Sequence, residues 1–168
     1  MLNRRTFLSK GAATLVSPII IAKTDVFSIL NSTNIASVNV AVIGTGARGK
    51  GLMRILVNTN NVNLIAYCDV LTFRLNEALE IAPKAKAYTD YLELLQHKNL
   101  DAIIISTPLN THAQIALDAV NANLHIYCEK TLVKGAQETK NLVQKVKNDH
   151  TKIFQTGHQY HSSRLYSH

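Results

Sequence analysis

The sequence predicts an α/β fold built on a doubly wound parallel sheet. Two observations predict it. Short runs of Val, Ile and Ala alternate along the chain with stretches of helical spacing, and a glycine-rich turn follows the first of these runs. Continuous apolar runs are typical of strands that helices cover on both faces. Alternation of strands and helices at this pitch favours parallel pairing with helical crossovers.

Five apolar runs predict the main strands, and a sixth segment is a candidate edge strand. The first run ends in a glycine, the second ends before an aspartate, and the last is the weakest of the five. The predicted strands are Val38–Ile43, Val62–Cys68, Ala102–Ile105, Leu124–Cys128 and Lys152–Thr156, with Lys86–Tyr88 as the additional edge strand.

The segments between these runs carry apolar residues at helical spacing. Pro83 is expected to end the second helix, and Thr111 is a candidate N-cap for the helix over His112–Val120. The side chains expected to face inward are Leu52, Ile55 and Leu56 in the first helix, Leu75, Leu79 and Ala82 in the second, Leu92 and Leu95 in the third, Ile115, Ala116 and Ala119 in the fourth, and Leu142, Val143 and Val146 in the fifth.

Composition and charge exclude several classes of protein. The 168 residues, 46% of them hydrophobic, suit one domain with a sizeable core and not a disordered chain. A mean hydropathy of +0.02 excludes a multi-span membrane protein. The formal charge is +7, of which residues 1–30 carry +3, and the remainder contains no basic run. No nucleic-acid partner is therefore expected.

Residues 1–36 have the layout of an export signal and a polar join to the domain. The paired Arg4 and Arg5 precede a short apolar stretch, Ala12–Ala22, which as a helix would span only roughly 16 Å and so cannot cross a membrane stably. The segment NRRTFLSK resembles the twin-arginine signal, with Asn3 in front and Ser9 inserted as departures. We expect export through the twin-arginine machinery to the periplasm. The alternative is an amphipathic start with two chance arginines, and then a cytoplasmic protein.

The segment VNVAVIGTGARGKGL places a G-x-G-x-x-G motif between a strand and a helix. Gly44 permits the tight turn, Gly46 lets the backbone approach a pyrophosphate, and Gly49 allows close packing of the helix. Asp69 ends the next strand, where a carboxylate can accept hydrogen bonds from a ribose. The combination predicts a Rossmann dinucleotide site. The alternatives are a plain tight turn for the glycines and a helix N-cap for Asp69. The cofactor-binding residues expected in this loop are Gly44, Thr45, Gly46, Ala47, Arg48 and Gly49.

Asp69 also favours NAD over NADP, because a carboxylate there would repel the 2′-phosphate of NADP. Arg74 lies five residues further on. It could reach a 2′-phosphate, stack on adenine, or be a solvated helix residue.

Five motifs in order make the chain similar to the glucose–fructose oxidoreductase/inositol dehydrogenase (Gfo/Idh/MocA) family. They are GTGARG, Asp69, STPLNTH, CEKT and TGHQY, and the resemblance covers about residues 37–160. It implies a Rossmann domain that binds NAD and acts by hydride transfer on a sugar or polyol. It also implies a second domain carrying the substrate pocket and oligomer contacts, which we expect to be absent from this chain, with residues 161–168 as the start of the segment leading to it.

The resemblance implies roles for residues at the ends of the fourth and fifth main strands. Lys130 would lie beside the nicotinamide and hydrogen-bond the substrate hydroxyl, with Glu129 as its neighbour. Thr131 departs from the family's E-K-P motif, in which proline follows the lysine. The residues implied to line the cofactor are Thr107, Pro108, Asn110, His112, Glu129, Lys130 and Gln159. For His112 a backbone-bonded role at the helix start is an equal alternative.

The resemblance leaves three functions open. The chain is the NAD-binding part of an exported sugar oxidoreductase, part of an NAD-dependent glycosidase of the same fold, or a truncated non-catalytic NAD-binding module. A dehydrogenase accumulates NADH, whereas the glycosidase releases sugar without it. By itself the chain is expected to bind cofactor with little turnover, because its fold alone does not supply the chemistry.

The two cysteines and the C-terminal histidines predict no further chemistry. Cys68 and Cys128 end strands that lie three spacings apart in the strand order 3-2-1-4-5-6, about 14 Å, which is beyond disulfide reach. His158, His161 and His168 lack a third local ligand at metal-binding spacing, so no metal is expected.

Overall fold

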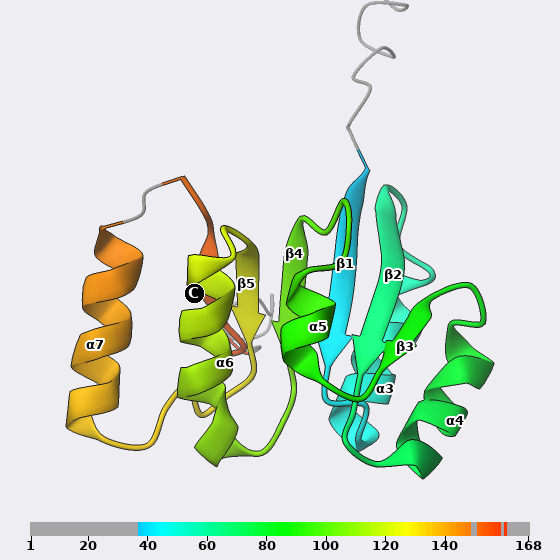
Figure 1. The fold of residues 1–168 in the computed structure, drawn as a ribbon, viewed down its shortest axis with the longest axis horizontal. Helices are drawn as coiled ribbons and strands as arrows, with labels where there is room; N and C mark the ends of the chain where they lie inside the picture. Colours follow the sequence, from blue (N-terminus) through cyan, green and yellow to red (C-terminus); the bar gives the residue numbers. More distant parts are fainter. Residues whose placement is uncertain (1–36, 149–150, 159, 161–168) are drawn as a thin grey trace, which may run out of the picture. The chain divides into compact units, whose positions relative to one another are not determined.

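A computed structural model describes residues 37–148, 151–158 and 160. They form a six-stranded parallel sheet in the order β3-β2-β1-β4-β5-β6, as predicted (Figure 1). The strands are β1 (Val38–Ile43), β2 (Val62–Cys68), β3 (Lys86–Tyr88), β4 (Ala102–Ile105), β5 (His125–Cys128) and β6 (Phe154–Thr156). The helices are α3 (Ala47–Leu56), α4 (Thr72–Ile81), α5 (Tyr91–Leu95), α6 (Leu109–Asn121) and α7 (Ala136–Lys147).

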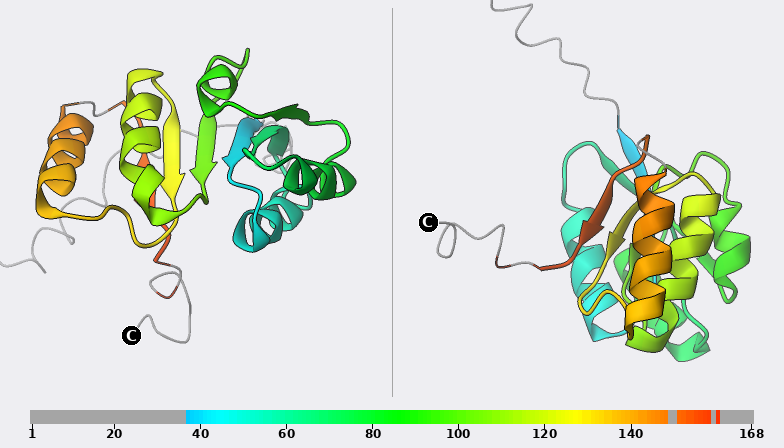
Figure 2. Two further views of the ribbon diagram at one scale, coloured as in Figure 1. Left: turned by 60° about the horizontal axis from the view of Figure 1, so that its bottom comes forward. Right: turned by 90° about the vertical axis from the view of Figure 1, so that its left-hand side faces the viewer.

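Helices cover both faces of the sheet, which explains why its strands are apolar throughout. Ala41 and Ile43 of β1 pack with α5, α6 and α7, whereas Val42 between them packs with Met53 of α3 and with α4. Successive side chains of a strand point to opposite faces, so each central strand contributes to two cores. The side view in Figure 2 shows α3 and α7 on opposite sides of the sheet.

Three of the predicted helix faces are wrong in part. Ile55, Leu79 and Val143 are exposed at 61%, 49% and 42%. Met53 and Ala78, which were not predicted, are buried in α3 and α4, whereas Leu142 of α7 is buried as predicted. In α3 the phase is set by Gly49, which packs on the turn before the helix and brings Met53, four residues on, to the same face.

The one-turn helix α5 differs in the same way, because its buried residue is Leu94 and Leu92 is exposed. The predicted N-cap of α6 is also wrong. The helix begins at Leu109 with Pro108 at the N-cap, because the proline backbone is already set at φ −61°. Thr111 lies inside the first turn, where its hydroxyl donates to the Pro108 carbonyl at 2.8 Å.

The turn between β1 and α3 depends on two glycines. Gly44 has φ +92°, and a Cβ there would lie 2.6 Å from the Ser106 carbonyl oxygen. A Cβ at Gly49 would overlap the carbonyl oxygen of Gly44. The predicted roles of Gly44 in the tight turn and of Gly49 in close packing are confirmed by these contacts.

Among the described residues, no helix is long and apolar enough to cross a membrane. In the same part of the chain, no group of three or more His, Cys, Asp or Glu side chains is placed to hold a metal ion. His161 and His168 lie outside the described residues, as do the predicted export signal and residues 161–168.

Cys68 and Cys128 are buried free thiols. Strand register places Cys68 beside Ile43, Ile43 beside Ile105, and Ile105 beside Cys128, so one row across four strands carries both cysteines at its ends. Burial raises the pKa of each thiol to about 12. The prediction that they are buried packing residues is confirmed.

We expect Gly49→Ala to lower the free energy of unfolding by at least about 2 kcal/mol, because the new methyl group meets backbone that cannot move aside. Gly51→Ala is the matched control in the same helix, with nothing within 4 Å of its Cβ. It should raise stability by roughly 0.5–1 kcal/mol, since alanine is the better helix former. Urea unfolding of both variants checks this, and equal effects would contradict the packing role of Gly49.

Alkali should destabilise the fold through the two thiols. Unfolded thiols lose their protons near their ordinary pKa, whereas the folded ones hold theirs to about 12, so unfolding is favoured as the pH rises from 9. The expected decline reaches at most about 1.4 kcal/mol per thiol per pH unit. Urea titrations at pH 8 to 11 measure it. The double variant C68A/C128A should decline less, and an equal decline would contradict the assignment.

Candidate functional site

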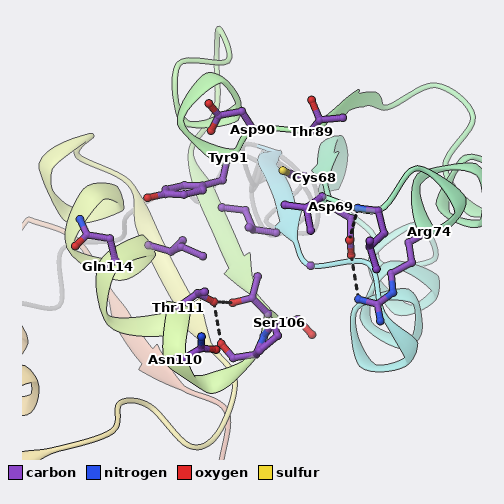
Figure 3. A pocket seen from close by; sticks show the side chains of 17 residues that line it. Cys68, Asp69, Arg74, Thr89, Asp90, Tyr91, Ser106, Asn110, Thr111 and Gln114 are labelled. Carbon is purple, nitrogen blue, oxygen red and sulfur yellow. Dashed lines mark hydrogen bonds and ion pairs between the residues drawn. The ribbon is translucent and has the colours of Figure 1, made fainter.

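The carboxyl ends of the strands border two cavities that meet at Ser106 and Thr107. The larger has a volume of about 830 Å³ and lies between the ends of β1, β2 and β4 and the helices α4, α5 and α6 (Figure 3). The smaller, about 390 Å³, is lined by Arg48, Ser106, Thr107, Glu129 and Lys130. Ligands of open parallel sheets bind at this edge, where the strand order reverses between β1 and β4.

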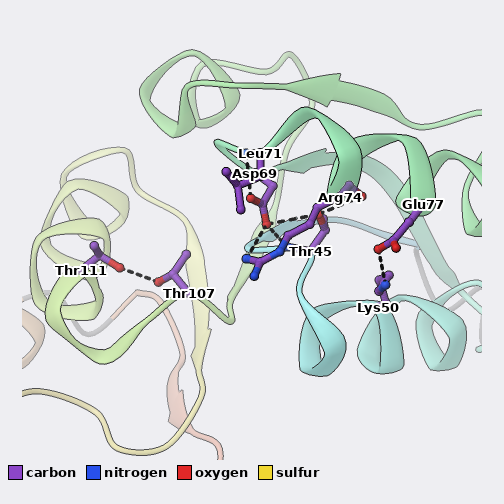
Figure 4. A network of polar contacts seen from close by, with 8 residues as sticks. All are labelled: Thr45, Lys50, Asp69, Leu71, Arg74, Glu77, Thr107 and Thr111. Carbon is purple, nitrogen blue, oxygen red and sulfur yellow. Dashed lines mark hydrogen bonds and ion pairs between the residues drawn. The ribbon is translucent and has the colours of Figure 1, made fainter.

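Asp69 follows β2 at the wall of the larger cavity and is only 6% exposed. Its Oδ2 accepts the backbone N–H of Thr45 at 2.9 Å, and its Oδ1 accepts the N–H of Leu71 at 3.0 Å (Figure 4). The N-cap of α4 is Leu71, so Asp69 is not the helix cap that the sequence left open. The carboxylate instead joins the glycine-rich turn to the end of β2.

Arg74 turns back from α4 to this carboxylate, with its Nη1 at 3.7 Å from the Asp69 Oδ2. Its guanidinium carbon also lies 5.7 Å from the ring centre of Phe73. Figure 4 shows the Arg74 side chain reaching across the turn to Asp69. Of the three roles that the sequence left open for Arg74, full solvation does not fit this position.

Of the glycine-rich turn, Gly44 lines the larger cavity and Arg48 lines the smaller one. Thr45 is fully buried, and its hydroxyl contacts Asp69 at 3.3 Å, so this side chain is held within the turn. Gly46 is half-buried and Ala47 exposed at the start of α3, where the first backbone N–H groups of a helix lack partners within the helix. This is the arrangement that binds phosphate groups.

Arg48 bridges the turn to the end of β5. Its Nε and Nη2 donate to one oxygen of Glu129 at 2.8 and 2.6 Å, and this bond raises the pKa of Arg48. Glu129 is 6% exposed, and the Tyr127 hydroxyl lies 3.4 Å from the same oxygen. Lys130 follows on the exposed rim of the smaller cavity, and its peptide bond to Thr131 is cis.

The residues predicted around the STPLNTH segment divide into two groups. Thr107, Pro108 and Asn110 line the larger cavity. His112 lines neither cavity and is 2% exposed. Its ring nitrogens lie 2.8 Å from the Thr107 carbonyl oxygen and 2.9 Å from that of Thr131, which fits the backbone-bonded alternative. Gln159 lies outside the described residues.

Sequence reasoning missed part of the cavity wall. Tyr91 at the start of α5 lines it, and the tyrosine hydroxyl donates to Asp118 of α6 at 2.8 Å. Burial, with this hydrogen bond, raises the pKa of Tyr91 to about 12. The position after the short strand β3 was the available signal, because loops at this end of each strand can reach the ligand crevice. The other missed lining residues are Ile43, Cys68, Val70, Leu71, Thr89, Asp90, Ser106, Thr111, Gln114 and Ile115.

Known proteins are similar to this chain in sequence and in fold. The inositol 2-dehydrogenase of Salmonella typhimurium is 32% identical over 118 residues, which are 69% of this chain and 35% of that protein. A glycosyl hydrolase family 109 protein of Stenotrophomonas maltophilia is 32% identical over 143 residues, covering 76% of this chain and 29% of the relative. The chain thus spans about a third of the length of these relatives.

Solved structures agree. The myo-inositol 2-dehydrogenase of Lactobacillus plantarum superposes with a TM-score of 0.73 at 30% identity, covering 76% of this chain and 38% of that one. The myo-inositol dehydrogenase of Lactobacillus casei, crystallised with NAD(H) and myo-inositol, gives a TM-score of 0.72 at 27% identity over the same shares. The sequence profile of the oxidoreductase family with an NAD-binding Rossmann fold matches residues 38–158. The chain therefore belongs to the Gfo/Idh/MocA oxidoreductase family and contains its NAD-binding Rossmann domain.

Proposed function

We propose that this chain is the cofactor-binding part of an enzyme that oxidises a hydroxyl of an inositol-like polyol or sugar by transfer of hydride to NAD. The observation that carries the proposal is the position of Asp69, buried at the wall of the larger cavity and bonded to the glycine-rich turn. Inositol dehydrogenases among the relatives support the substrate class.

The residues present fit a dinucleotide. The lack of side chains at Gly44 and Gly49 brings the start of α3 against the end of β4, and the backbone at Gly46 and Ala47 is open to a pyrophosphate. In this proposal Asp69, which lines the larger cavity, accepts the adenosine ribose hydroxyls with its remaining lone pairs. The apolar wall that includes Val70 and Tyr91 suits the adenine ring.

Asp69 and Arg74 together favour NAD over NADP. A 2′-phosphate would meet the Asp69 carboxylate, and the cation that could balance it is already paired with that carboxylate. The ribose hydroxyls of NAD need only acceptors, which Asp69 supplies.

In this proposal Lys130, which lines the smaller cavity, acts on the substrate hydroxyl. A cation at the carboxyl end of β5 orients the oxygen and assists its loss of a proton. Arg48 and Glu129 hold the strand end that precedes it. Bound NAD supplies the hydride acceptor. The base that takes the proton and the substrate pocket belong to the part of the enzyme that this chain does not span.

A second candidate is an NAD-dependent glycosidase of the same fold. It is supported by the glycosyl hydrolase family 109 relative, whose aligned region of 143 residues is longer than that of the inositol dehydrogenase. The two candidates differ in outcome for the full enzyme, because a dehydrogenase accumulates NADH and the glycosidase regenerates NAD in each cycle.

We further propose export by the twin-arginine route, supported by the sequence NRRTFLSK. That route carries folded proteins, which suits a chain that must acquire a cytoplasmic cofactor.

The cofactor proposal predicts that the 168-residue chain binds NAD more tightly than NADP. Asp69→Asn should weaken NAD binding roughly tenfold to a hundredfold and reduce this preference, because the ribose loses a charged acceptor. Asp101→Asn is the control, since Asp101 accepts the N–H of Asn39 at the amino end of the strands. Calorimetric titration measures all three proteins. A wild-type chain that does not bind NAD contradicts the proposal.

The export proposal predicts an envelope form that is shorter by roughly 22–37 residues, as intact mass would show after cell fractionation. Replacing both Arg4 and Arg5 by lysine keeps the charge and should leave full-length protein in the cytoplasm. A wild-type chain that stays cytoplasmic and untrimmed would exclude the export signal.

A further inference from the structure

The Ser106 hydroxyl is the one buried side-chain N or O atom, in the part of the chain that the structure describes, without a hydrogen-bond partner. Ser106 follows β4, and its backbone N–H donates to Ile43 at 2.8 Å. Other buried polar side chains at this edge, such as Asp69 and Glu129, have partners. A buried hydroxyl without a hydrogen bond is destabilising, so its presence at a ligand site suggests a partner that arrives with the ligand.

Ser106 lies where the two cavities meet. It lines both of them, together with Thr107. A Cβ built on Gly49 would lie 3.6 Å from the Ser106 Oγ, so the hydroxyl faces the start of α3. Figure 3 shows Ser106 at the end of β4, on the edge of the larger cavity. A dinucleotide can bind with its adenosine in the larger cavity and its nicotinamide in the smaller one. Its pyrophosphate then lies beside Ser106, which lines both cavities.

The cationic side chains around the glycine-rich turn form ion pairs with carboxylates. Arg48 is paired with Glu129, Lys50 with Glu77, and Arg74 with Asp69. The phosphates therefore depend on neutral donors, which are the backbone N–H groups at the start of α3 and hydroxyls beside them. The Thr107 hydroxyl accepts from that of Thr111 at 2.8 Å, and the Thr45 hydroxyl donates toward Asp69, whereas the Ser106 hydroxyl has no partner among the described residues.

We propose that the Ser106 hydroxyl donates a hydrogen bond to the pyrophosphate of the bound dinucleotide. Ser106 lines both cavities and its Oγ is covered without ligand, so this donation requires the side chain to rotate about its Cα–Cβ bond. The inference rests on the proposed NAD binding and adds a residue to it.

The test is titration of the wild-type chain and Ser106→Ala with NAD, ADP-ribose and adenosine. NAD and ADP-ribose should each bind about five- to twentyfold more weakly to the variant, because both contain the pyrophosphate. Adenosine, which lacks it, should bind equally to both proteins. Ser106→Cys should behave like Ser106→Ala, since it keeps the side-chain volume and loses the strong donor. Ser37→Ala is the control, an exposed serine whose Oγ accepts from Asn63.

Thermal unfolding without ligand separates binding from folding. Ser106→Ala should be as stable as the wild type or more stable, because it removes an unsatisfied hydroxyl. Weaker NAD binding with unchanged or raised stability supports the proposal. Unchanged NAD affinity overturns it, as does an equal loss for adenosine or a loss confined to NAD. If the wild type itself does not bind NAD, the proposed function fails, and this inference fails with it.

Discussion

The close contact between Gly44 and Gly49 sets the geometry of the site. A helix can begin this near the end of β1 only because neither residue carries a side chain. The same approach places Ser106, the residue after β4, against the turn and keeps Thr45 within reach of Asp69. One backbone contact thus fixes three strand ends relative to the start of α3. Since parallel strands carry their ligand groups on loops, this contact provides rigidity that the loops themselves do not have.

Ion pairs then join segments that are distant in sequence. Arg48 connects α3 to β5 across 81 residues, and Arg74 connects α4 to the end of β2. The carboxylates of both pairs are mostly buried, and each accepts several hydrogen bonds, which offsets the cost of removing a charge from water. Both arginines are therefore already paired with carboxylates of the same chain, although their side chains are 47% and 38% exposed.

The sequence was sufficient for the sheet and insufficient for much of the site. Three strands begin and end as predicted, namely Val38–Ile43, Val62–Cys68 and Ala102–Ile105. The polar residues on either side of an apolar run indicate where the strand begins and ends. The close packing at Gly49 could be predicted from its place in the G-x-G-x-x-G motif. Leu79 is exposed because apolar residues surround α4 and leave no unique inward face. Ile55 is exposed because the contact of Gly49 with Gly44 sets the phase of α3. The Arg48–Glu129 pair and the wall residue Tyr91 depend on contacts between elements, which local patterns do not contain.

The row that ends in Cys68 and Cys128 has a consequence for oxidation. In the sheet these sulfurs are three strand spacings apart, about 14 Å, so the native state cannot form a disulfide. In an unfolded chain the same two thiols can meet. Oxidation would then lock the chain in a form that the sheet cannot accommodate and make unfolding irreversible. In oxidising surroundings the lifetime of the folded protein therefore depends on its rate of unfolding. The burial of both thiols in the sheet is the reason, because they can react only after the chain unfolds.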